Sequence, residues 1–264
     1  MARRAAVAVV IALCGCGQAA APSVSATPSA SATPSATPTA ATSPSATPAP
    51  VACAAGCIKQ LPAGKHTTTA FLPGMTVTLP DNSWWSSQDS PGEFNLRLIA
   101  HPGAAVFFWI DPIPVKDQLV VAGVPNTPAG ILTWMRSNDY LVIRPPFGGS
   151  APTGVSILGG GITALSVRAH VTDLAPQAGP ACLGGPCVDY FRFTDRQKYI
   201  TYGTGLGEPV RLYLAAIGSG SSMHMLLVSV DEQTESDPAI FSLLQAGADT
   251  ILSTLHLPSR LPRS

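Results

Sequence analysis

The feature that most constrains this chain is a long tract without charge, which separates Arg4 from Lys59. From Gln18 to Pro50 the tract consists almost entirely of Ala, Ser, Thr and Pro, with Ser-Ala-Thr-Pro recurring. It has almost no large apolar side chains to bury, so it cannot offset the entropy lost on folding. Its spaced prolines favour an extended chain that rises about 3.1 Å per residue. A folded core must therefore come from residues 51–264, which we expect to form one domain.

The chain begins with the features of an export signal. Arg3 and Arg4 precede an apolar run from Ala5 to Leu13, which would span only about 14 Å as a helix. A bilayer core is about 30 Å thick, so the run predicts a signal peptide over residues 1–15 and not a membrane anchor. Because both arginines would leave with the leader, the exported chain is expected to be mildly acidic.

The Leu-Cys-Gly-Cys stretch that ends at Cys16 resembles a bacterial lipobox, in which a small residue precedes the cysteine that receives the lipid. The resemblance implies that Cys16 is lipidated, whereas Cys14 is the poorer candidate because leucine precedes it. A cysteine at the second lipobox position departs from the usual Ala, Ser or Thr. Residues 16–50 would then be a lipidated cysteine and a disordered tether at the outer face of the bacterial cell membrane. The alternative is an ordinary secretory signal cut at Gly17 or in the alanines beyond it.

The charge balance excludes a nucleic-acid-binding protein. The chain has 15 Lys+Arg against 15 Asp+Glu, and only 11% of its residues are charged, against about 25% in a typical soluble protein. A protein that binds nucleic acid would show a basic excess or a basic stripe. The 24 glycines and 26 prolines indicate many turns and few long helices.

The four cysteines of the domain form two close pairs, Cys53 with Cys57 and Cys182 with Cys187. Because an exported protein reaches an oxidising environment, we expect these four cysteines to form disulfides. We favour the two local pairings, because a Gly-Gly-Pro turn can bring Cys182 and Cys187 together. The tighter spacing of the first pair leaves a long-range pairing of the two clusters open. Neither spacing is the Cys-x2-Cys of a zinc site, so we expect no metal and no cofactor.

Short alternating apolar runs predict about eight β-strands. The clearest alternating runs are 75–79, 93–99, 162–171, 188–193, 210–217 and 223–230. The last two are joined by Gly-Ser-Gly-Ser from Gly218, which predicts a hairpin. Residues 106–110 form a continuous apolar run, as expected for a central strand.

Two segments predict helices, and each begins with a capping residue and a proline, Thr127-Pro128 and Asp237-Pro238. We expect the first to end near 137 and the second near 255. Their apolar stripes are Ile131, Trp134 and Met135, and then Ile240, Leu243, Leu244, Ala248, Ile251, Leu252 and Leu255. The prediction is an α+β domain, in which a mainly antiparallel sheet has one face covered by two helices, including a C-terminal helix.

The order of motifs resembles a group of uncharacterised actinobacterial secreted proteins and lipoproteins, which open with TTT-F-P, VP-x-GW and ED-x-PG-x-F. The matching residues are Thr67–Pro80, Trp84 and Trp85, and Asp89–Phe94. The chain departs from that pattern just before the tryptophans, where asparagine and serine replace a glycine. More loosely, a β-first domain with a C-terminal helix is similar to the Mog1/PsbP-type lipoproteins of mycobacteria. The resemblance implies a cell-envelope location and a binding or assembly role, without a catalytic residue.

The candidate metal and phosphate sites are weak. Met223 and Met225 would face away from His224 on a strand, so the three cannot share a metal, and we expect the methionines in the core. The glycine-rich runs 158–161 and 203–207 precede strand-like sequence and not helices, so they predict turns and not phosphate cradles.

Four acidic residues gather at Asp231, Glu232, Glu235 and Asp237. A calcium loop needs a glycine at its sharp turn, and the segment has none. We expect a solvated loop whose acids favour the N-terminus of the following helix.

Catalytic residues are not evident either. His101 and His170 have no acidic partner at a telling spacing, although Asp173 follows His170 by three residues, and no Gly-x-Ser-x-Gly elbow occurs. The candidate binding residues are Trp84 and Trp85, because neighbours on a strand face opposite ways and one ring would be exposed. The alternative is that both rings pack in the core.

These features together predict a non-catalytic, lipid-anchored protein of the bacterial cell envelope that binds a protein or a glycan. Its membrane contact would be the lipid, and the sequence does not fix its oligomeric state. One alternative is an envelope hydrolase or transferase, marked by a pocket lined by His170 and Asp173. The other is a small-molecule carrier, marked by a closed apolar cavity beneath the helices.

The lipid anchor is tested by labelling growing cells with radioactive palmitate. We expect label in the wild-type protein, and loss of both label and membrane association in Cys16→Ala, because the acylated thiol is then missing. Cys14→Ala is the matched control and should keep the label. An unlabelled wild-type protein, with Cys16→Ala released no more than wild type, would show that the anchor is wrong.

Overall fold

The computed structural model describes residues 59–72, 74–146, 154–175, 187–195, 198–220, 223–233 and 237–258. The predicted signal peptide, the predicted lipidation site Cys16 and the predicted tether lie outside these residues, as do Cys53, Cys57 and Cys182. Cys187 is disulfide-bonded, and the pairing scheme stays a prediction. Within the described ranges, no helix has the length and apolar character needed to cross a membrane.

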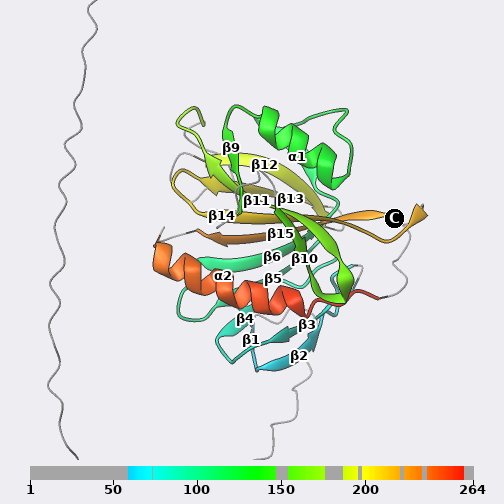
Figure 1. Ribbon diagram of the computed structural model, residues 1–264, viewed down its shortest axis with the longest axis vertical. Coiled ribbons are helices and arrows are strands. Elements are labelled where there is room, and N and C mark those ends of the chain that lie inside the picture. Colours follow the sequence, from blue (N-terminus) through cyan, green and yellow to red (C-terminus); the bar gives the residue numbers. More distant parts are fainter. Residues whose placement is uncertain are drawn as a thin grey trace, which may run out of the picture. The chain divides into compact units, whose positions relative to one another are not determined.

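A nine-stranded antiparallel sheet forms the centre of the domain (Figure 1). Its order is β1-β4-β5-β6-β15-β14-β11-β10, and β9 also pairs with β11. The strands are β1 (Lys59–Leu61), β4 (Trp84–Ser86), β5 (Glu93–Leu98), β6 (Ala104–Ile110), β9 (Leu141–Arg144), β10 (Gly154–Ile157), β11 (Thr163–Val171), β14 (Val210–Ile217) and β15 (His224–Glu232). The predicted hairpin after Gly218 is confirmed, because β14 and β15 pair from Ile217 and His224 onward.

The central sheet is buried on both faces. Alternate residues of β6 enter different cores: Val106 and Phe108 lie in one, and Phe107 and Trp109 lie in the other. A strand buried on both faces has an unbroken apolar sequence and not an alternating one. The continuous run seen in the sequence from Val106 therefore reflects a second covering layer.

One face is covered by α2 (Pro238–Ser253) and by a hairpin of β2 (Gly64–Thr67) and β3 (Thr76–Leu79). The side chain of Asp237 caps α2 by accepting a hydrogen bond from the Ala239 N–H at 2.8 Å. The helix lies so close to the sheet that a Cβ atom on Gly247 would come within 2.6 Å of the Trp84 ring. Glycine at this position therefore lets the helix pack against the buried tryptophan.

The other face is covered by α1 (Pro128–Ser137) and by a second antiparallel sheet of order β13-β12-β7-β8. Its strands are β7 (Ile113–Lys116), β8 (Leu119–Val120), β12 (Cys187–Asp195) and β13 (Lys198–Gly205). Aromatic rings fill the space between the two sheets, and Trp109 stacks on Phe193 with 4.2 Å between ring centroids. The two helices thus lie on opposite faces (Figure 1), and the prediction that both cover one face is wrong.

The α+β class, the mainly antiparallel pairing and both helices are as expected, but several details differ. The described residues contain fifteen strands and not about eight, because short strands in the loops complete the covering layers. In α2, Leu243 is 59% exposed, while Phe241 is buried in its place. Gly203 lies inside β13 and not in a turn, where a Cβ atom would come within 2.6 Å of the Val188 carbonyl oxygen. Residues 159–161 form a short 3-10 helix.

Polar side chains are buried within the aromatic core between the two sheets. We call the group of Tyr202, Glu208, Ser229 and Asp231 the polar seam. Asp231 and Glu232 are fully buried in β15, so the prediction of a solvated loop is wrong for these two acids. The Asp231 carboxylate accepts hydrogen bonds from the Tyr202 hydroxyl at 2.5 Å and from the Ser229 hydroxyl at 2.9 Å. Burial raises the pKa of Asp231 to about 6, and burial together with the Asp231 charge raises the pKa of Glu208 to about 8.

The seam makes stability depend on pH. Because these carboxyls hold protons in the folded state that the unfolded chain has lost, folding takes up protons, and the free energy of unfolding falls as the pH rises from 5 to 8. Glu208→Gln keeps an oxygen that can accept from the Gly205 N–H but has no proton to lose. We expect it to be more stable than wild type at pH 8 by on the order of 2 kcal/mol, and similar at pH 5.

Urea unfolding at a series of pH values measures this difference. The matched control is Asp173→Asn, which changes an exposed carboxyl in a turn and should keep the wild-type slope. The raised pKa of Glu208 would be wrong if the free energy of unfolding of Glu208→Gln fell with rising pH as steeply as that of wild type.

Candidate functional site

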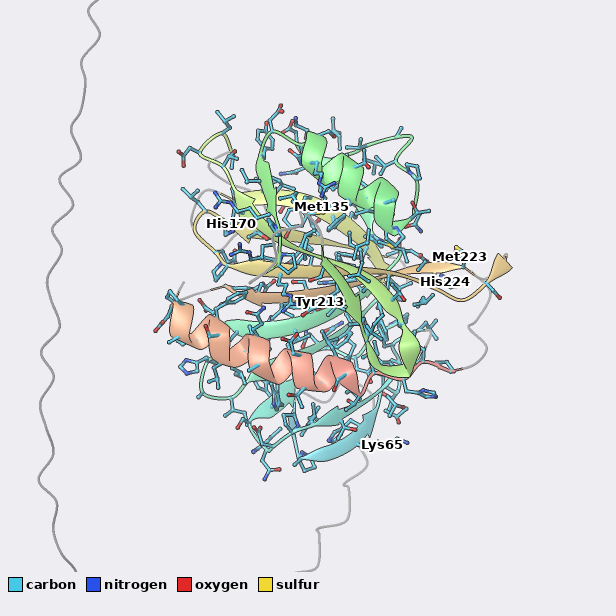
Figure 2. The ribbon with its side chains drawn as sticks, viewed as in Figure 1. Lys65, Met135, His170, Tyr213, Met223 and His224 are labelled. Atoms are coloured by element: carbon cyan, nitrogen blue, oxygen red, sulfur yellow. The ribbon has the colours of Figure 1, made fainter. Side chains whose placement is uncertain are left out.

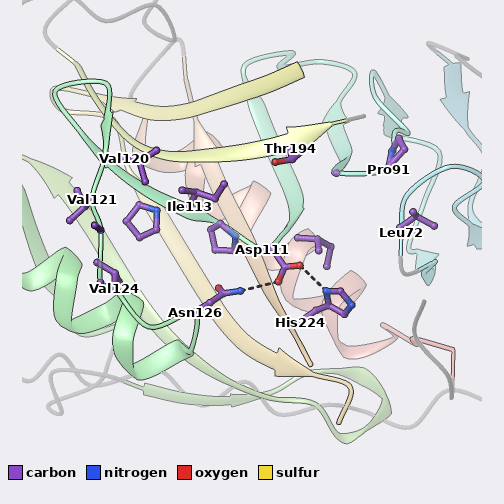
Figure 3. Close-up of a pocket in the computed structure, with 16 residues that line it drawn as sticks. Leu72, Pro91, Asp111, Ile113, Val120, Val121, Val124, Asn126, Thr194 and His224 are labelled. Carbon is purple, nitrogen blue, oxygen red and sulfur yellow. Dashed lines mark hydrogen bonds and ion pairs between the residues drawn. The ribbon is translucent and has the colours of Figure 1, made fainter. Parts of the chain in front are cut away.

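A groove of about 690 Å³ lies where the chain passes from β6 of the central sheet to β7 of the second sheet (Figure 3). One wall is formed by the crossing segment itself, from Ile110 to Pro114, and a second by the chain that follows β8, from Val120 to Asn126. The opposite side is formed by Leu72, Pro91 and Gly92, and the remaining lining residues are Thr194 and His224. The groove is therefore a product of the corner between the two sheets.

Asp111 is the polar centre of this corner. Its N–H donates to the Met225 carbonyl at 2.8 Å, and its Oδ1 accepts from the Met225 N–H at 2.9 Å, so it extends the pairing of β6 with β15. Oδ1 also accepts from Asn126 Nδ2 at 3.1 Å, and Oδ2 lies 2.7 Å from His224 Nδ1. Figure 3 shows both side-chain contacts within the groove. One carboxylate thus joins the end of the sheet, the 120–126 wall and the histidine.

Backbone strain is concentrated beside the groove. Among the described residues, the non-glycine residues with positive φ are Asp111, Asp117 and Gln118, at 51°, 50° and 65°. Each such conformation costs about 1–2 kcal/mol in a residue with a side chain. Asp117 and Gln118 form the turn between β7 and β8, and the Gln118 carbonyl accepts from Arg192 Nη2 at 2.9 Å. Strain that the surrounding contacts maintain is a mark of functional segments.

The motif residues of the resembled family build the opposite wall. Asp89 Oδ1 accepts from the N–H groups of Ala70 and Phe71 at 3.1 and 2.8 Å, and its Oδ2 accepts from the Thr69 N–H and hydroxyl at 2.7 and 2.8 Å. Leu72, which follows Phe71 in the chain, is half exposed and lines the groove. The threonine run and the Asp-Ser-Pro-Gly stretch are therefore one structural unit, which fixes this wall.

The lining is mostly hydrocarbon. The polar side chains among its described residues are those of Asp111, Asn126, Thr194 and His224, and these described residues include no Lys, Arg, Phe, Tyr or Trp. They also include no Ser or Cys, and their one hydroxyl is that of Thr194. Within the described ranges, no group of three or more His, Cys, Asp or Glu side chains is placed to hold a metal ion. Such a site can bind an apolar group and orient it by hydrogen bonds at one polar corner.

The two tryptophans chosen from the sequence lie elsewhere. Trp84 is buried against α2, and Trp85 is half-buried on the opposite face of β4, where it pairs with Arg97. The alternation of the two rings is as expected from a strand. Neither ring lines the groove.

Of the histidines considered in the sequence, His224 lines the groove and His170 does not. His170 lies on β11, away from His224 (Figure 2); burial lowers its pKa, and Arg144 and Arg168 lower it further. Neither His170 nor Asp173 lines the groove.

The methionines beside His224 are not a buried pair. Met225 is fully buried, but Met223 is 53% exposed at the start of β15, so the expectation that both lie in the core is wrong. His224 faces away from Met225, as predicted, and joins the groove. Asp111 and Asn126 were not chosen from the sequence. The available signal is the Asp-Pro-Ile-Pro stretch, which interrupts the apolar run at Asp111 and marks where the chain leaves the sheet.

The strain at the β7–β8 turn can be tested by replacing a glutamine with glycine at two positions, one in the turn and one in a helix. Glycine adopts positive φ without a steric cost, so we expect Gln118→Gly to raise the free energy of unfolding by about 1 kcal/mol. The control is Gln245→Gly inside α2, where the same substitution should lower it by about 1 kcal/mol. Thermal and urea unfolding measure both. Equal losses in the two variants would mean that Gln118 is unstrained.

Comparisons with solved structures give matches at low identity and low TM-score. No family model matches the chain, and no curated protein matches it. A crystal structure from Bacteroides thetaiotaomicron is similar with a TM-score of 0.36 and 10% identity, over 76% of this chain and 50% of that chain. This chain thus spans about half the length of that protein. LpqN, described as involved in cell envelope biogenesis of Mycobacterium tuberculosis, is similar with a TM-score of 0.35 and 16% identity, over 76% of this chain and 95% of that chain.

Proposed function

We propose that this chain is a non-catalytic, lipid-anchored accessory protein of the bacterial cell envelope that binds a partner protein in the Asp111 groove. The signal peptide, the lipobox at Cys16 and the uncharged tether support the location. The resemblance to actinobacterial secreted proteins and to Mog1/PsbP-type lipoproteins agrees with a binding or assembly role.

The observation that carries the proposal is an apolar groove beside the strained segment from Asp111 to Gln118. Its volume of about 690 Å³ lies within the range of about 300–1,000 Å³ typical of ligand sites. The favoured two-residue hairpin turn requires positive φ at both central residues, so the β7–β8 turn accounts for Asp117 and Gln118. Asp111 is the residue with positive φ that lines the groove, and shaping a recognition surface is a benefit that offsets its strain.

The lining favours a protein over a glycan. Recognition of sugars commonly uses the faces of aromatic rings, and none of the described residues that line the groove is Phe, Tyr or Trp. The groove also lies beside β8, an edge strand of the second sheet. A strand edge offers backbone hydrogen bonds that a peptide can use. The Asp111–His224 pair could orient an imidazole for catalysis, but the lining residues that the structure describes include no Ser or Cys nucleophile for it.

The test is photo-cross-linking in intact cells, with a photoreactive amino acid in place of Val121 in the groove. We expect a discrete protein adduct, identified by mass spectrometry. A probe in place of the exposed Asp173, which does not line the groove, is the matched control and should give none. Val120→Trp should abolish the adduct, because its larger side chain would fill the groove that the partner occupies.

Three results would contradict the proposal. The first is an adduct with lipid or small molecules alone, which would favour the carrier alternative. The second is equal protein adducts from both probe positions. The third is an adduct that Val120→Trp leaves unchanged.

A further inference from the structure

We infer that the groove recognises an extended apolar peptide with a basic side chain, which pairs with the outer edge of β8 and places its cation beside Asp111. This inference rests on the proposed function and goes further, because it names the chemistry and the backbone conformation of the partner segment.

The edge of β8 is open and apolar. β8 is the last strand of the second sheet, and within the described part of the chain it pairs with β7 alone. Its two residues, Leu119 and Val120, are 72% and 53% exposed. Natural proteins normally protect such an edge with charge, proline or a covering segment, because it is a template for another strand. An added peptide strand would cover these side chains and use the free backbone groups.

The groove would receive one face of that strand. Side chains of an extended peptide alternate between two faces, so every second residue would enter the space bounded by Ile113, Val120 and Val121. These walls are aliphatic, and each buried methylene contributes about 0.8 kcal/mol. The peptide residues that enter the groove are therefore apolar, apart from the one that reaches the polar corner.

The polar corner selects the charge of that residue. The Asp111 side chain is 37% exposed, and the His224 side chain beside it is 10% exposed. Among the described residues that line the groove there is no Lys or Arg. Lys116 pairs with Asp139 at 3.4 Å, and Arg192 binds the Gln118 carbonyl. A carboxylate in aliphatic surroundings attracts a cation more strongly than it would in water, and it repels an anion.

The test uses three capped, fluorescently labelled peptides of alternating valine and threonine that differ only in a central lysine, glutamine or glutamate. Binding to the purified full chain is measured by fluorescence anisotropy. We expect the lysine peptide to bind about fivefold more tightly than the glutamine peptide, and the glutamate peptide to bind most weakly. A lysine peptide with N-methyl groups on the amides of one strand edge should not bind, because it cannot pair with β8.

Two variants assign the effect to the groove. Asp111→Asn should remove the preference for lysine over glutamine, whereas Asp173→Asn, which changes an exposed carboxyl outside the groove, should keep it. Because Asp111 also connects two strands, unfolding of Asp111→Asn would be checked by circular dichroism. Val120→Lys leaves the contacts of Asp111 with the two strands intact, since Val120 is more than half exposed. This variant should bind the glutamate peptide more tightly than the lysine peptide.

The outcomes separate this inference from the proposed function. Equal binding of the lysine and glutamate peptides, or binding that survives N-methylation, would overturn the inference and leave a groove that binds proteins by another chemistry. If no peptide binds and the Val121 probe also captures no protein in cells, the proposed function itself fails. Retained lysine preference in Val120→Lys would place the binding site elsewhere and overturn both.

Discussion

The double burial of the central sheet is the constraint on which the rest of the structure depends. A sheet whose strands are apolar on both faces must be covered twice, and this chain has only two helices in its described part to do it. α2 and the β2–β3 hairpin cover one face, and α1 covers part of the other. The second sheet completes that cover, so most of the short strands exist to close a layer that the helices leave open.

The groove follows from the same constraint. To supply the second sheet, the chain must leave β6 and turn into β7 at Asp111, where the backbone adopts a positive φ of 51°. The Asp111 carboxylate replaces the strand pairing that ends there by binding the Met225 N–H and His224. The corner cannot be filled by either sheet, and the loops around it supply aliphatic walls. Site and fold thus share one residue, so changes at Asp111 need controls that separate binding from stability.

The regular elements could be predicted because they rest on local patterns. The proline and capping residue at Thr127-Pro128 specify the start of α1, and apolar spacing specifies the strand at Val210–Ile217. The burial of Asp231 could not be predicted, because its partner Tyr202 belongs to the second sheet and meets it only when the two sheets pack. An acidic residue near a predicted loop is usually solvated, and only the tertiary contact reverses that expectation.

The sequence by itself determined the elements that depend on neighbours along the chain, which are two capped helices and a mainly antiparallel sheet. The export signal and the tether stay predictions. The candidate site could not be predicted from the sequence, because the groove combines residues from Leu72 to His224 that no spacing connects. The tertiary structure alone decided that the helices lie on opposite faces, that Trp84 is core, and that Asp111 meets His224. The physical reason is that local patterns report which side of an element is apolar, while packing between layers decides what that side meets.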